Sequence, residues 1–491
     1  MFKKILVANR GEIAVRILRA CREMKITGVA VYSDVDETAL HVRMADEAYR
    51  IGAAPAGESY LRADRIIETA RRCGAEAIHP GYGFLSENAE FAGQCRSAGI
   101  TFIGPPPEAM RKLGEKIPAL EIARGAGVPT IPGSNGAVRE LTAALKIALE
   151  IGYPVMLKAS GGGGGKGMRL VGSEEELRRV WDVTQNEAAS SFGNPVVFLE
   201  KYLVHPRHIE IQVLADHHGN VLYFPERECS LQRRHQKIVE ESPSPAVDPA
   251  LRKKMGEAAA LLASTAGYQN AGTVEFLMDA DGKFFFLEMN TRLQVEHPVT
   301  EMVTGVDLVH LQIRIAAGEQ LLLGQSGIDA RGHAVECRIY AEDPGNQFMP
   351  SPGTIASLEE PAGPGIRNDT GIYPGAEISL YYDPLISKLI AHAGTRQEAL
   401  ARAVRALREY RISGIRTSIP FLSRLLQDPR VASGRLHTGL VAEILESSDG
   451  TEDEGWREAL IAAALMYQSP QKRRLAPEQS SWRQGFWEHM P

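Results

Sequence analysis

Short apolar runs and amphipathic stretches alternate over the first part of the chain. Each apolar run has the length of a strand, whereas each amphipathic stretch has the 3.6-residue periodicity of a helix. Strands are expected at residues 4–8, 28–32, 75–79 and 101–104, and helices at 12–24, 62–72 and 87–98. Strands joined by single helices form right-handed βαβ units, so this part is predicted to be a parallel sheet with covering helices.

Changes in pattern then divide an α/β chain into further parts. Pro105-Pro106-Pro107 end the parallel unit. The first division is an α/β domain at 1–110, and the second is an α+β domain at 111–330, whose segment 131–203 forms a lid with a glycine-rich loop. A third domain is expected at 331–447, with a helix at 397–411. An acidic spacer, a short helix and a polar tail follow at 448–491.

Composition and charge exclude several classes of protein. Hydrophobic residues make up 44% of the 491 positions, which is enough for several cores. The formal net charge of −6 provides no basic field for nucleic acid or acidic lipid. No apolar run approaches the roughly 20 residues of a membrane span, and the run at 5–8 is too short for a signal peptide. We therefore expect a cytoplasmic protein that binds neither nucleic acid nor membrane.

Five consecutive glycines, among them Gly163 and Gly164, stand between Lys158 and Met168. Glycine loses the most backbone entropy on folding, so the run is unsuited to a helix or strand. Its bare N–H groups could instead close over an anion such as phosphate. The run is not a Walker A loop, which requires glycine where Ser160 stands. A flexible linker is the alternative, although Lys158 places a cation at a strand end beside the loop.

A pair of glutamates is the strongest geometric signal. Residues 272–290 read as two alternating strands around Asp281-Gly282, which is typical of a two-residue hairpin turn. Counting outward from that turn places Glu275 directly opposite Glu288. Because like charges facing each other destabilise a sheet, the pair suggests a divalent cation between them, and oxygen ligands favour magnesium or manganese. Two carboxylates splayed into water are the alternative.

Polar residues continue at every second position beyond Glu288. If the strand stays extended, Asn290, Arg292, Gln294 and Glu296 share its face. An amide, a cation and a carboxylate beside a metal could hold an anionic substrate and accept its proton. An exposed edge strand would also be polar on one side.

Two further polar segments leave their roles open. Residues 229–237, followed by Glu240 and Glu241, contain too few cations to bind nucleic acid, and a solvated charged surface is the alternative. The segment Glu200-Lys-Tyr-Leu203 follows a strand at 196–199, and its backbone could contact an adenine edge.

Five motifs in this order resemble the ATP-grasp superfamily and, within it, the biotin carboxylases. They are LVANRGEIA (6–14), HPGYGFLSEN (79–88), KASGGGGGKGM (158–168), RRHQK (233–237) and EMNTRLQVEHPVTE (288–301). The resemblance extends over residues 1–447. It implies an N-terminal α/β domain, an ATP-grasp domain with a hinged glycine-rich lid and a C-terminal domain that completes the site.

The resemblance also implies a reaction, in which bicarbonate attacks the γ-phosphate of ATP and the resulting carboxyphosphate carboxylates biotin. The implied ATP-binding residues are Lys116, Lys158, Gly163, Gly164, Glu200, Lys201, Leu203, His208, Gln232, His235, Lys237, Glu275 and Glu288. The implied ligands of Mg²⁺ or Mn²⁺ are Glu275, Glu288 and Asn290, and the implied bicarbonate pocket is Lys237, Arg292, Gln294 and Val295. Glu296 is implied as the general base, Arg338 as the cation that binds biotin and stabilises its anion, and Arg292 and Lys237 as further catalytic residues.

Partners follow from the same resemblance. The chain has no Ala-Met-Lys-Met biotinyl site, because its one Met-Lys pair, Met24-Lys25, reads as a helix end. Biotin is therefore expected on a separate biotin carboxyl carrier protein that works with carboxyltransferase subunits, and a homodimer is expected. Acetyl-CoA, as in fatty acid biosynthesis, is the first choice of acceptor, with pyruvate or propionyl-CoA as alternatives. Another ATP-grasp ligase, or an inactive interaction module, remains as a competing interpretation.

Overall fold

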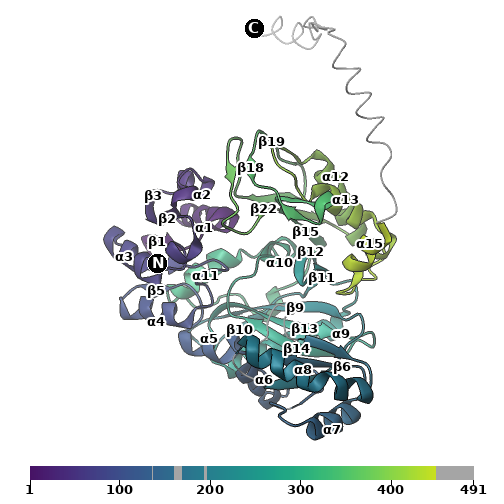
Figure 1. The fold of residues 1–491 in the computed structure, drawn as a ribbon. Helices are drawn as coiled ribbons and strands as arrows, with labels where there is room; N and C mark the ends of the chain where they lie inside the picture. The colour runs from purple at the N-terminus through teal and green to yellow at the C-terminus, as the bar shows by residue number, and fades with distance from the viewer. Residues whose placement is uncertain (135, 160–167, 193–195, 449–491) are drawn as a thin grey trace, which may run out of the picture. The chain divides into compact units, whose positions relative to one another are not determined.

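A computed structural model of the chain describes residues 1–134, 136–159, 168–192 and 196–448 (Figure 1). Its N-terminal part is a five-stranded parallel sheet with β1 at the centre. In spatial order the strands are β3 (Glu47–Gly52), β2 (Thr27–Ser33), β1 (Lys4–Val7), β4 (Ala77–His79) and β5 (Thr101–Phe102), and the helices are α1 (Gly11–Glu23), α2 (Leu40–Met44), α3 (Ala63–Cys73) and α4 (Ala89–Ser97). The predicted parallel α/β unit is confirmed.

The hydrophobic pattern does not predict one strand of this sheet. Strand β3 has the sequence EAYRIG, and only its last two residues, Ile51 and Gly52, are buried. It lies at the edge of the sheet, where one side of the strand has no neighbour. An apolar run is therefore not needed to hold it in place.

A nine-stranded antiparallel sheet forms the body of the rest of the structure. Its strands in spatial order are β14 (Phe284–Asn290), β13 (Asn270–Met278), β9 (Arg207–Ala215), β11 (Arg227–Arg233), β12 (Gln236–Ser242), β15 (His333–Tyr340), β22 (Leu385–Ala393) and β20 (Ile366–Thr370), with β10 (Val221–Tyr223) beside β9. The pairing of β12 with β15 joins the segment before residue 290 to the segment after residue 333. Side chains from both segments can therefore meet on one face of a single sheet.

A small three-stranded sheet stands apart with its own core. It contains β7 (Met168–Val171), β6 (Val155–Ala159) and β8 (Val197–Lys201), and it packs against α7 (Leu141–Ile151) and α8 (Glu174–Phe192). Leu157, Trp181 and Leu199 are among its buried residues. Gly163 and Gly164 lie outside the described residues, between β6 and β7.

Helices and short strands complete the described part. The helices are α5 (Pro107–Gly114), α6 (Lys116–Gly125), α9 (Pro249–Thr265), α10 (His297–Thr304), α11 (Leu308–Ala316), α12 (Arg396–Glu409), α13 (Ile419–Gln427), α14 (Pro429–Ala432) and α15 (Leu440–Ser448). The short strands are β16 (Glu342–Asp343), β17 (Met349–Pro350), β18 (Gly353–Thr354), β19 (Ser357–Glu359), β21 (Glu377–Ile378) and β23 (Arg411–Ser413). The predicted helix at 397–411 is α12, which begins at a capping box of Thr395 and Glu398.

The chain divides into two units, residues 1–442 and residues 443–491. The predicted acidic spacer, short helix and polar tail fall almost entirely on residues 449–491, outside the described part. Among the described residues, no helix combines the length and the apolar character that crossing a membrane requires.

Candidate active site

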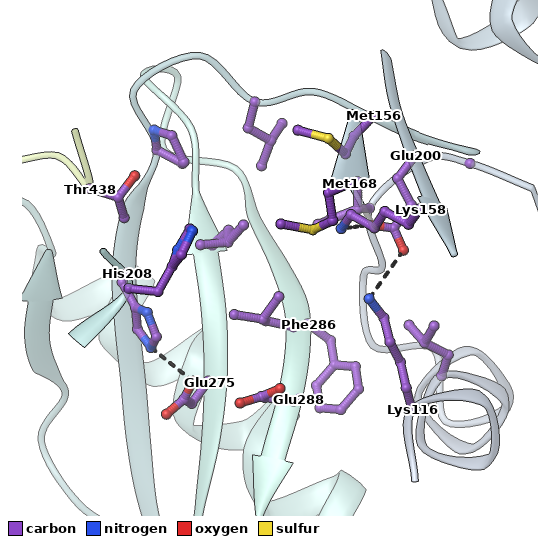
Figure 2. Close-up of a pocket in the computed structure, with 18 of the residues that line it drawn as sticks. Lys116, Met156, Lys158, Met168, Glu200, His208, Glu275, Phe286, Glu288 and Thr438 are labelled. Carbon is purple, nitrogen blue, oxygen red and sulfur yellow. Dashed lines mark hydrogen bonds and ion pairs between the residues drawn. The ribbon is translucent and has the colours of Figure 1, made fainter. Parts of the chain in front are cut away.

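A cavity of about 770 Å³ lies between the small sheet and the β14 end of the large sheet (Figure 2). The residues predicted from separate motifs meet on its walls. They are Lys116, Lys158, Glu200, Lys201, Leu203, His208, Gln232, His235, Lys237, Glu275, Glu288, Asn290, Arg292, Gln294, Val295 and Arg338. The remaining described residue of the predicted set, Glu296, is fully buried beside this cavity, in contact with Lys237 and Arg338.

Four charged residues form a row across four neighbouring strands. Arg227 of β11 pairs with Glu210 of β9, Glu210 pairs with Glu275 of β13, and Glu275 pairs with Glu288 of β14. The predicted opposition of Glu275 and Glu288 is confirmed, and both point into the cavity in Figure 2. Three carboxylates side by side on one sheet require cations nearby.

The route to that register differs from the predicted hairpin. Met278 pairs with Phe284, and the amide N–H of Asp279 donates to the carbonyl of Lys283, so the loop has three residues and ends at Gly282 with φ +78°. The predicted two-residue turn is wrong. A β-bulge that inserts Leu287 shifts the register by one residue and brings Glu288 opposite Glu275.

The strand ends sooner than the alternating pattern suggests. Strand β14 stops at Asn290, and residues 291–296 form a loop that leads into α10. The prediction of one extended face from Glu288 to Glu296 is therefore wrong. The loop nevertheless returns Arg292, Gln294 and Val295 to the cavity wall.

Arg292 is held by a residue that the alternating pattern does not indicate. Its Nε donates to Glu87 Oε2 at 2.9 Å, and its Nη atoms donate to Asn290 Oδ1 and Gln294 Oε1, both at 3.0 Å. Glu87 also accepts from the backbone N–H of Thr291 at 2.9 Å. The guanidinium is thereby fixed at the cavity wall in the orientation that an anion could meet.

The ammonium group of Lys237 is the centre of the acidic cluster. Its Nζ lies 2.6 Å from Glu210, 2.9 Å from Glu275 and 2.6 Å from Glu296. Burial opposes the charged form of Lys237, but these three carboxylates outweigh it and raise the pKa of the ammonium well above its usual range. Arg227, which is fully buried, is a second cation in contact with Glu210.

Glu210 belongs to a set of polar residues that the sequence could have revealed. Strand β9 reads RHIEIQVLA, in which His208, Glu210 and Gln212 occupy alternate positions of an otherwise apolar strand. Alternation at a period of two places these side chains on one face. His208 uses this position to contact Glu275, with its Nε2 3.0 Å from the carboxylate, while Gln232 contacts its other ring nitrogen at 2.9 Å.

The two carboxylates opposed across the hairpin are electrostatically different. Burial raises the pKa of Glu275, but Lys237 and His208 outweigh it and hold that pKa well below its usual range. Limited hydration at the cavity wall, and then the negative charge of Glu275, raise the pKa of Glu288. Glu275 therefore has its cationic partners in the ligand-free protein, whereas Glu288 faces the cavity beside a like charge.

Arg338 connects two buried carboxylates on the other side of Lys237. Its guanidinium lies 2.6 Å from Glu240 Oε1 and 2.8 Å from Glu296 Oε2. Burial alone would raise the pKa of Glu296, but Lys237 and then Arg338 hold it well below its usual range. In the ligand-free protein Glu296 is accordingly ionised and bound to two cations.

The end of the cavity at the small sheet holds a second charge cluster (Figure 2). The Glu200 carboxylate contacts Lys158 directly and lies 3.7 Å from Lys116. Lys201 points elsewhere, since its Nζ donates to the carbonyls of Gly152 and Tyr153 at 2.9 and 3.0 Å. The side chain of Lys201 thus links β8 to the end of α7.

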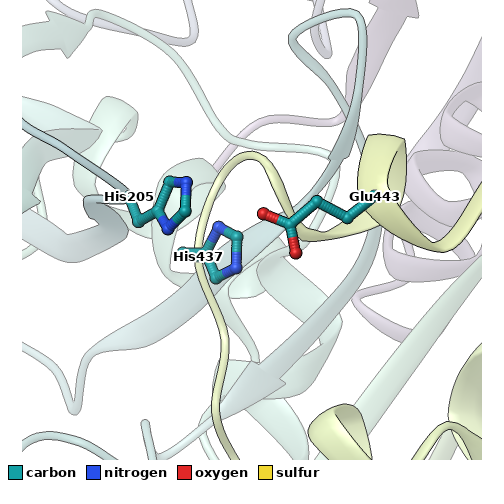
Figure 3. A group of neighbouring side chains, drawn as sticks. All are labelled: His205, His437 and Glu443. Carbon is teal, nitrogen blue, oxygen red and sulfur yellow. The ribbon is translucent and has the colours of Figure 1, made fainter. Parts of the chain in front are cut away.

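Thr438 adds a wall to the cavity from the C-terminal part of the first unit. The preceding residue, His437, stacks on His205, which follows β8, with ring centroids 4.3 Å apart and an interplanar angle of 13° (Figure 3). The stack holds the loop after β8 against the loop that contains His437 and Thr438. Leu203 of the first loop and Thr438 of the second both line the cavity.

Three family models match the chain in succession. "Biotin carboxylase, N-terminal domain" matches residues 1–110, "Carbamoyl-phosphate synthase L chain, ATP binding domain" matches residues 115–323, and "Biotin carboxylase C-terminal domain" matches residues 336–443.

Two similar proteins have nearly the same length as this chain, and a third is longer. A pyruvate carboxylase subunit of Methanothermobacter thermautotrophicus is 54% identical over 91% of this chain and 91% of its own. Biotin carboxylase of Halalkalibacterium halodurans is 53% identical over 92% of this chain and 99% of its own. The propionyl-CoA carboxylase alpha chain of Ruegeria pomeroyi is 49% identical over 96% of this chain and 73% of its own.

A solved structure has the same fold. It is the biotin carboxylase domain dimer of Hydrogenobacter thermophilus 2-oxoglutarate carboxylase in complex with MgADP, ADP and bicarbonate. It has a TM-score of 0.85 and 50% identity, and the match covers 92% of this chain and all of that one.

Proposed function

Since the chain belongs to the biotin carboxylase family, we propose that it carboxylates biotin with bicarbonate in an ATP-dependent reaction. The observation that carries this function is the position of Glu296. This buried carboxylate lies between Lys237 and Arg338, beside a cavity large enough for a nucleotide. A base between two cations suits a reaction whose substrate is an anion that must lose a proton.

ATP would occupy the cavity with its phosphates toward the cationic side chains. Lys116 and Lys158, which share Glu200 in the ligand-free protein, are available to the phosphates once the nucleotide binds. Leu203, Gln232 and His235 lie on the cavity wall, and we assign them to the nucleotide together with His208 and the backbone of Lys201, whose side chain is bound to Gly152 and Tyr153. Phosphoryl transfer chiefly requires positioning and neutralisation of charge, which these residues supply without a covalent intermediate.

The donor set on β13 and β14 fits a magnesium or manganese ion. Glu275, Glu288 and Asn290 offer oxygen atoms, which hard divalent cations prefer. The negative charge of Glu275 raises the pKa of Glu288, so a cation at this position would relieve a repulsion that is present in the protein. When bound, the ion would neutralise charge on the β- and γ-phosphates.

Bicarbonate would bind where Arg292, Gln294 and Val295 reach the wall. Its oxygen attacks the γ-phosphorus, the bond to the ADP oxygen breaks, and the bicarbonate proton passes to Glu296. Lys237 holds the pKa of Glu296 low in the ligand-free protein. An anion that draws Lys237 toward itself weakens that effect, and the burial of Glu296 then raises its proton affinity.

Arg338 would serve the second half of the reaction. Carboxyphosphate would break down to carbon dioxide and phosphate, and the phosphate would take the proton from the ureido nitrogen of biotin. The resulting biotin anion, with charge on its ureido oxygen, would then bond to the carbon dioxide through that nitrogen. A guanidinium cannot act as a base at neutral pH, so Arg338 is suited to a counter-charge and not to proton transfer. Although its side chain is nearly buried, Arg338 lines the cavity, where a substrate could meet it.

The chain is a biotin carboxylase subunit of the kind found in multisubunit biotin-dependent carboxylases. We propose that its biotin is attached to a separate carrier protein, that carboxyltransferase subunits use the carboxybiotin, and that the chain forms a homodimer. We also propose domains at 1–110, 111–330 and 331–447, which the positions of the three family models support.

The similar proteins differ in the acceptor that their names give, since one is a pyruvate carboxylase subunit and another is a propionyl-CoA carboxylase alpha chain. We therefore keep acetyl-CoA, pyruvate and propionyl-CoA as candidate acceptors of the whole complex. Carboxylation assays with all three acceptors, using the native partners that co-purify with the chain, would decide among them.

The proposed reaction is tested by measuring phosphate and carboxybiotin together. With Mg-ATP and free biotin, ATP cleavage should require bicarbonate. Glu296→Ala should suppress both products by about 10²–10⁴-fold, because the base acts before carboxyphosphate forms. Arg338→Gln should suppress carboxybiotin by about 10²–10³-fold and phosphate far less. ATP cleavage without bicarbonate, and no carboxybiotin, would instead indicate another ATP-grasp ligase.

A further inference from the structure

We propose that Glu240 is the positioning residue that holds Arg338 in place while Glu296 changes charge during the reaction. This inference rests on the proposed function, in which Glu296 accepts a proton and Arg338 stabilises the biotin anion. Neither the motifs nor the row of charges on β9, β13 and β14 assigns a role to Glu240.

The strand register brings Glu240 to Arg338. Glu240 of β12 pairs with Glu336 of β15, and Arg338 lies two residues further along β15 on the same face. Both Nε and Nη2 of Arg338 lie 2.6 Å from the same oxygen of Glu240, Oε1. Nη2 also donates to Glu296 Oε2 at 2.8 Å, so one guanidinium nitrogen is shared by two carboxylates.

The two carboxylates would behave differently during the reaction. When Glu296 accepts the bicarbonate proton it becomes neutral, and its attraction for Arg338 falls. Glu240 then keeps the guanidinium at the position where biotin must meet it. The pKa of Glu240 is raised to about 7, chiefly because the group is buried. Arg338 lowers this pKa, and the negative charge of Glu296 raises it further. Neutralising Glu296 therefore favours the ionised form of Glu240 at the step that needs it.

The hydrogen bonds of the Glu240 side chain go to Arg338 alone among the described residues. Its Oε1 contacts Arg338, and its Oε2 is buried and has no hydrogen-bond partner within the described part of the chain. Glu240 is fully buried and Arg338 nearly so, which gives the contact a strength that a solvated pair would not have.

The test compares four variants of the full-length chain for phosphate release and carboxybiotin formation. Glu240→Gln preserves the shape of the side chain and removes its charge. We expect carboxybiotin formation to fall by about 10²-fold, which is typical of a misplaced catalytic group, with a higher KM for free biotin. Bicarbonate-dependent phosphate release should change much less. Glu240→Asp should recover part of the carboxylation, because it restores the charge.

Glu336→Gln is the matched control. Glu336 is equally buried, carries a carboxylate on the same face and lies opposite Glu240, but it makes no hydrogen bond to Arg338 among the described residues. It should leave the ratio of phosphate to carboxybiotin unchanged. Arg338→Gln provides the reference for complete uncoupling.

The outcomes separate this inference from the function on which it rests. If Arg338→Gln does not uncouple the two products, the assigned role of Arg338 is wrong. If Arg338→Gln uncouples phosphate release from carboxybiotin formation while Glu240→Gln lowers the two activities equally, or lowers neither of them, then Glu240 is not a positioning residue. Should Glu240→Gln fail to fold, Glu240→Asp decides: a raised ratio of phosphate to carboxybiotin supports the inference, and an unchanged ratio overturns it.

Discussion

Replacing Lys237 by methionine removes the cation on which the acidic cluster depends. Its Nζ lies within 2.9 Å of Glu210, Glu275 and Glu296, whose side chains are at most 5% exposed. Breaking a buried ion pair from one side typically costs about 3–5 kcal/mol. With a urea m value of roughly 3 kcal/mol/M, the midpoint of unfolding should fall by about 1 M.

The loss should depend on pH in a defined direction. Lys237 contributes to holding the pKa values of Glu275 and Glu296 below their usual range, so in the parent protein these groups stabilise the fold above the unfolded pKa of about 4.3. Without the lysine, burial raises their folded pKa values, and the variant regains stability as the pH falls toward the unfolded value. The difference between parent and variant should therefore be largest near pH 8 and shrink toward pH 5.

Urea unfolding followed by far-ultraviolet circular dichroism, without ATP and Mg²⁺, measures this difference at both pH values. Lys253→Met is the control, because its ammonium is 70% exposed and lies 3.7 Å from an exposed glutamate, so it should cost at most about 0.5 kcal/mol. A loss for Lys237→Met that is as small as this control, or equal at pH 8 and pH 5, would refute the electrostatic reasoning.

Three further predictions concern binding. Glu288→Gln should weaken Mg²⁺-dependent ATP binding by calorimetry and raise the thermal midpoint of the ligand-free protein, because it removes a like charge from the hairpin; unchanged Mg²⁺ dependence would contradict this. Lys388 is fully buried and donates to the Val295 carbonyl at 2.8 Å, so Lys388→Met should raise the KM for bicarbonate about 10-fold or more and leave the KM for ATP unchanged; equal increases would point to general unfolding. Valine at both Gly163 and Gly164 disfavours positive φ, so the KM for ATP should rise, and kinetics identical to the parent would leave the run as a linker.

Local pattern was sufficient where the hydrophobic effect acts within one element. Four of the five strands of the N-terminal sheet, and helices α1, α3 and α4, follow from apolar runs and helical periodicity, whereas the short helix α2 and strand β3 are missed. Strand β3 is missed because an edge strand can be polar. The Glu275–Glu288 pair was predicted from a two-residue turn that the structure lacks. The three-residue loop and the bulge at Leu287 each shift the register by one residue, and the two shifts cancel.

Contacts between distant segments account for what the pattern could not reveal. Glu87 is 205 residues from Arg292, and Glu240 is 98 residues from Arg338, yet each carboxylate binds its arginine directly. No periodicity within one element encodes such a pair. The polar alternation in β9 was visible in the sequence, but its meaning depends on which strands lie beside β9, which topology alone decides.

The ligand-free site is held together by the same groups that would bind the substrates. Lys237 neutralises Glu275 and Glu296, Lys158 neutralises Glu200, and Arg338 is shared by two carboxylates. Each cation is therefore already positioned and desolvated before a substrate arrives. When a substrate binds, each cation exchanges a carboxylate for an anionic group of the substrate. The charged side chains of the site therefore need little reorganisation during phosphoryl transfer. The same exchange frees Glu296 from its cations, which links the arrival of bicarbonate to the appearance of the base that must deprotonate it.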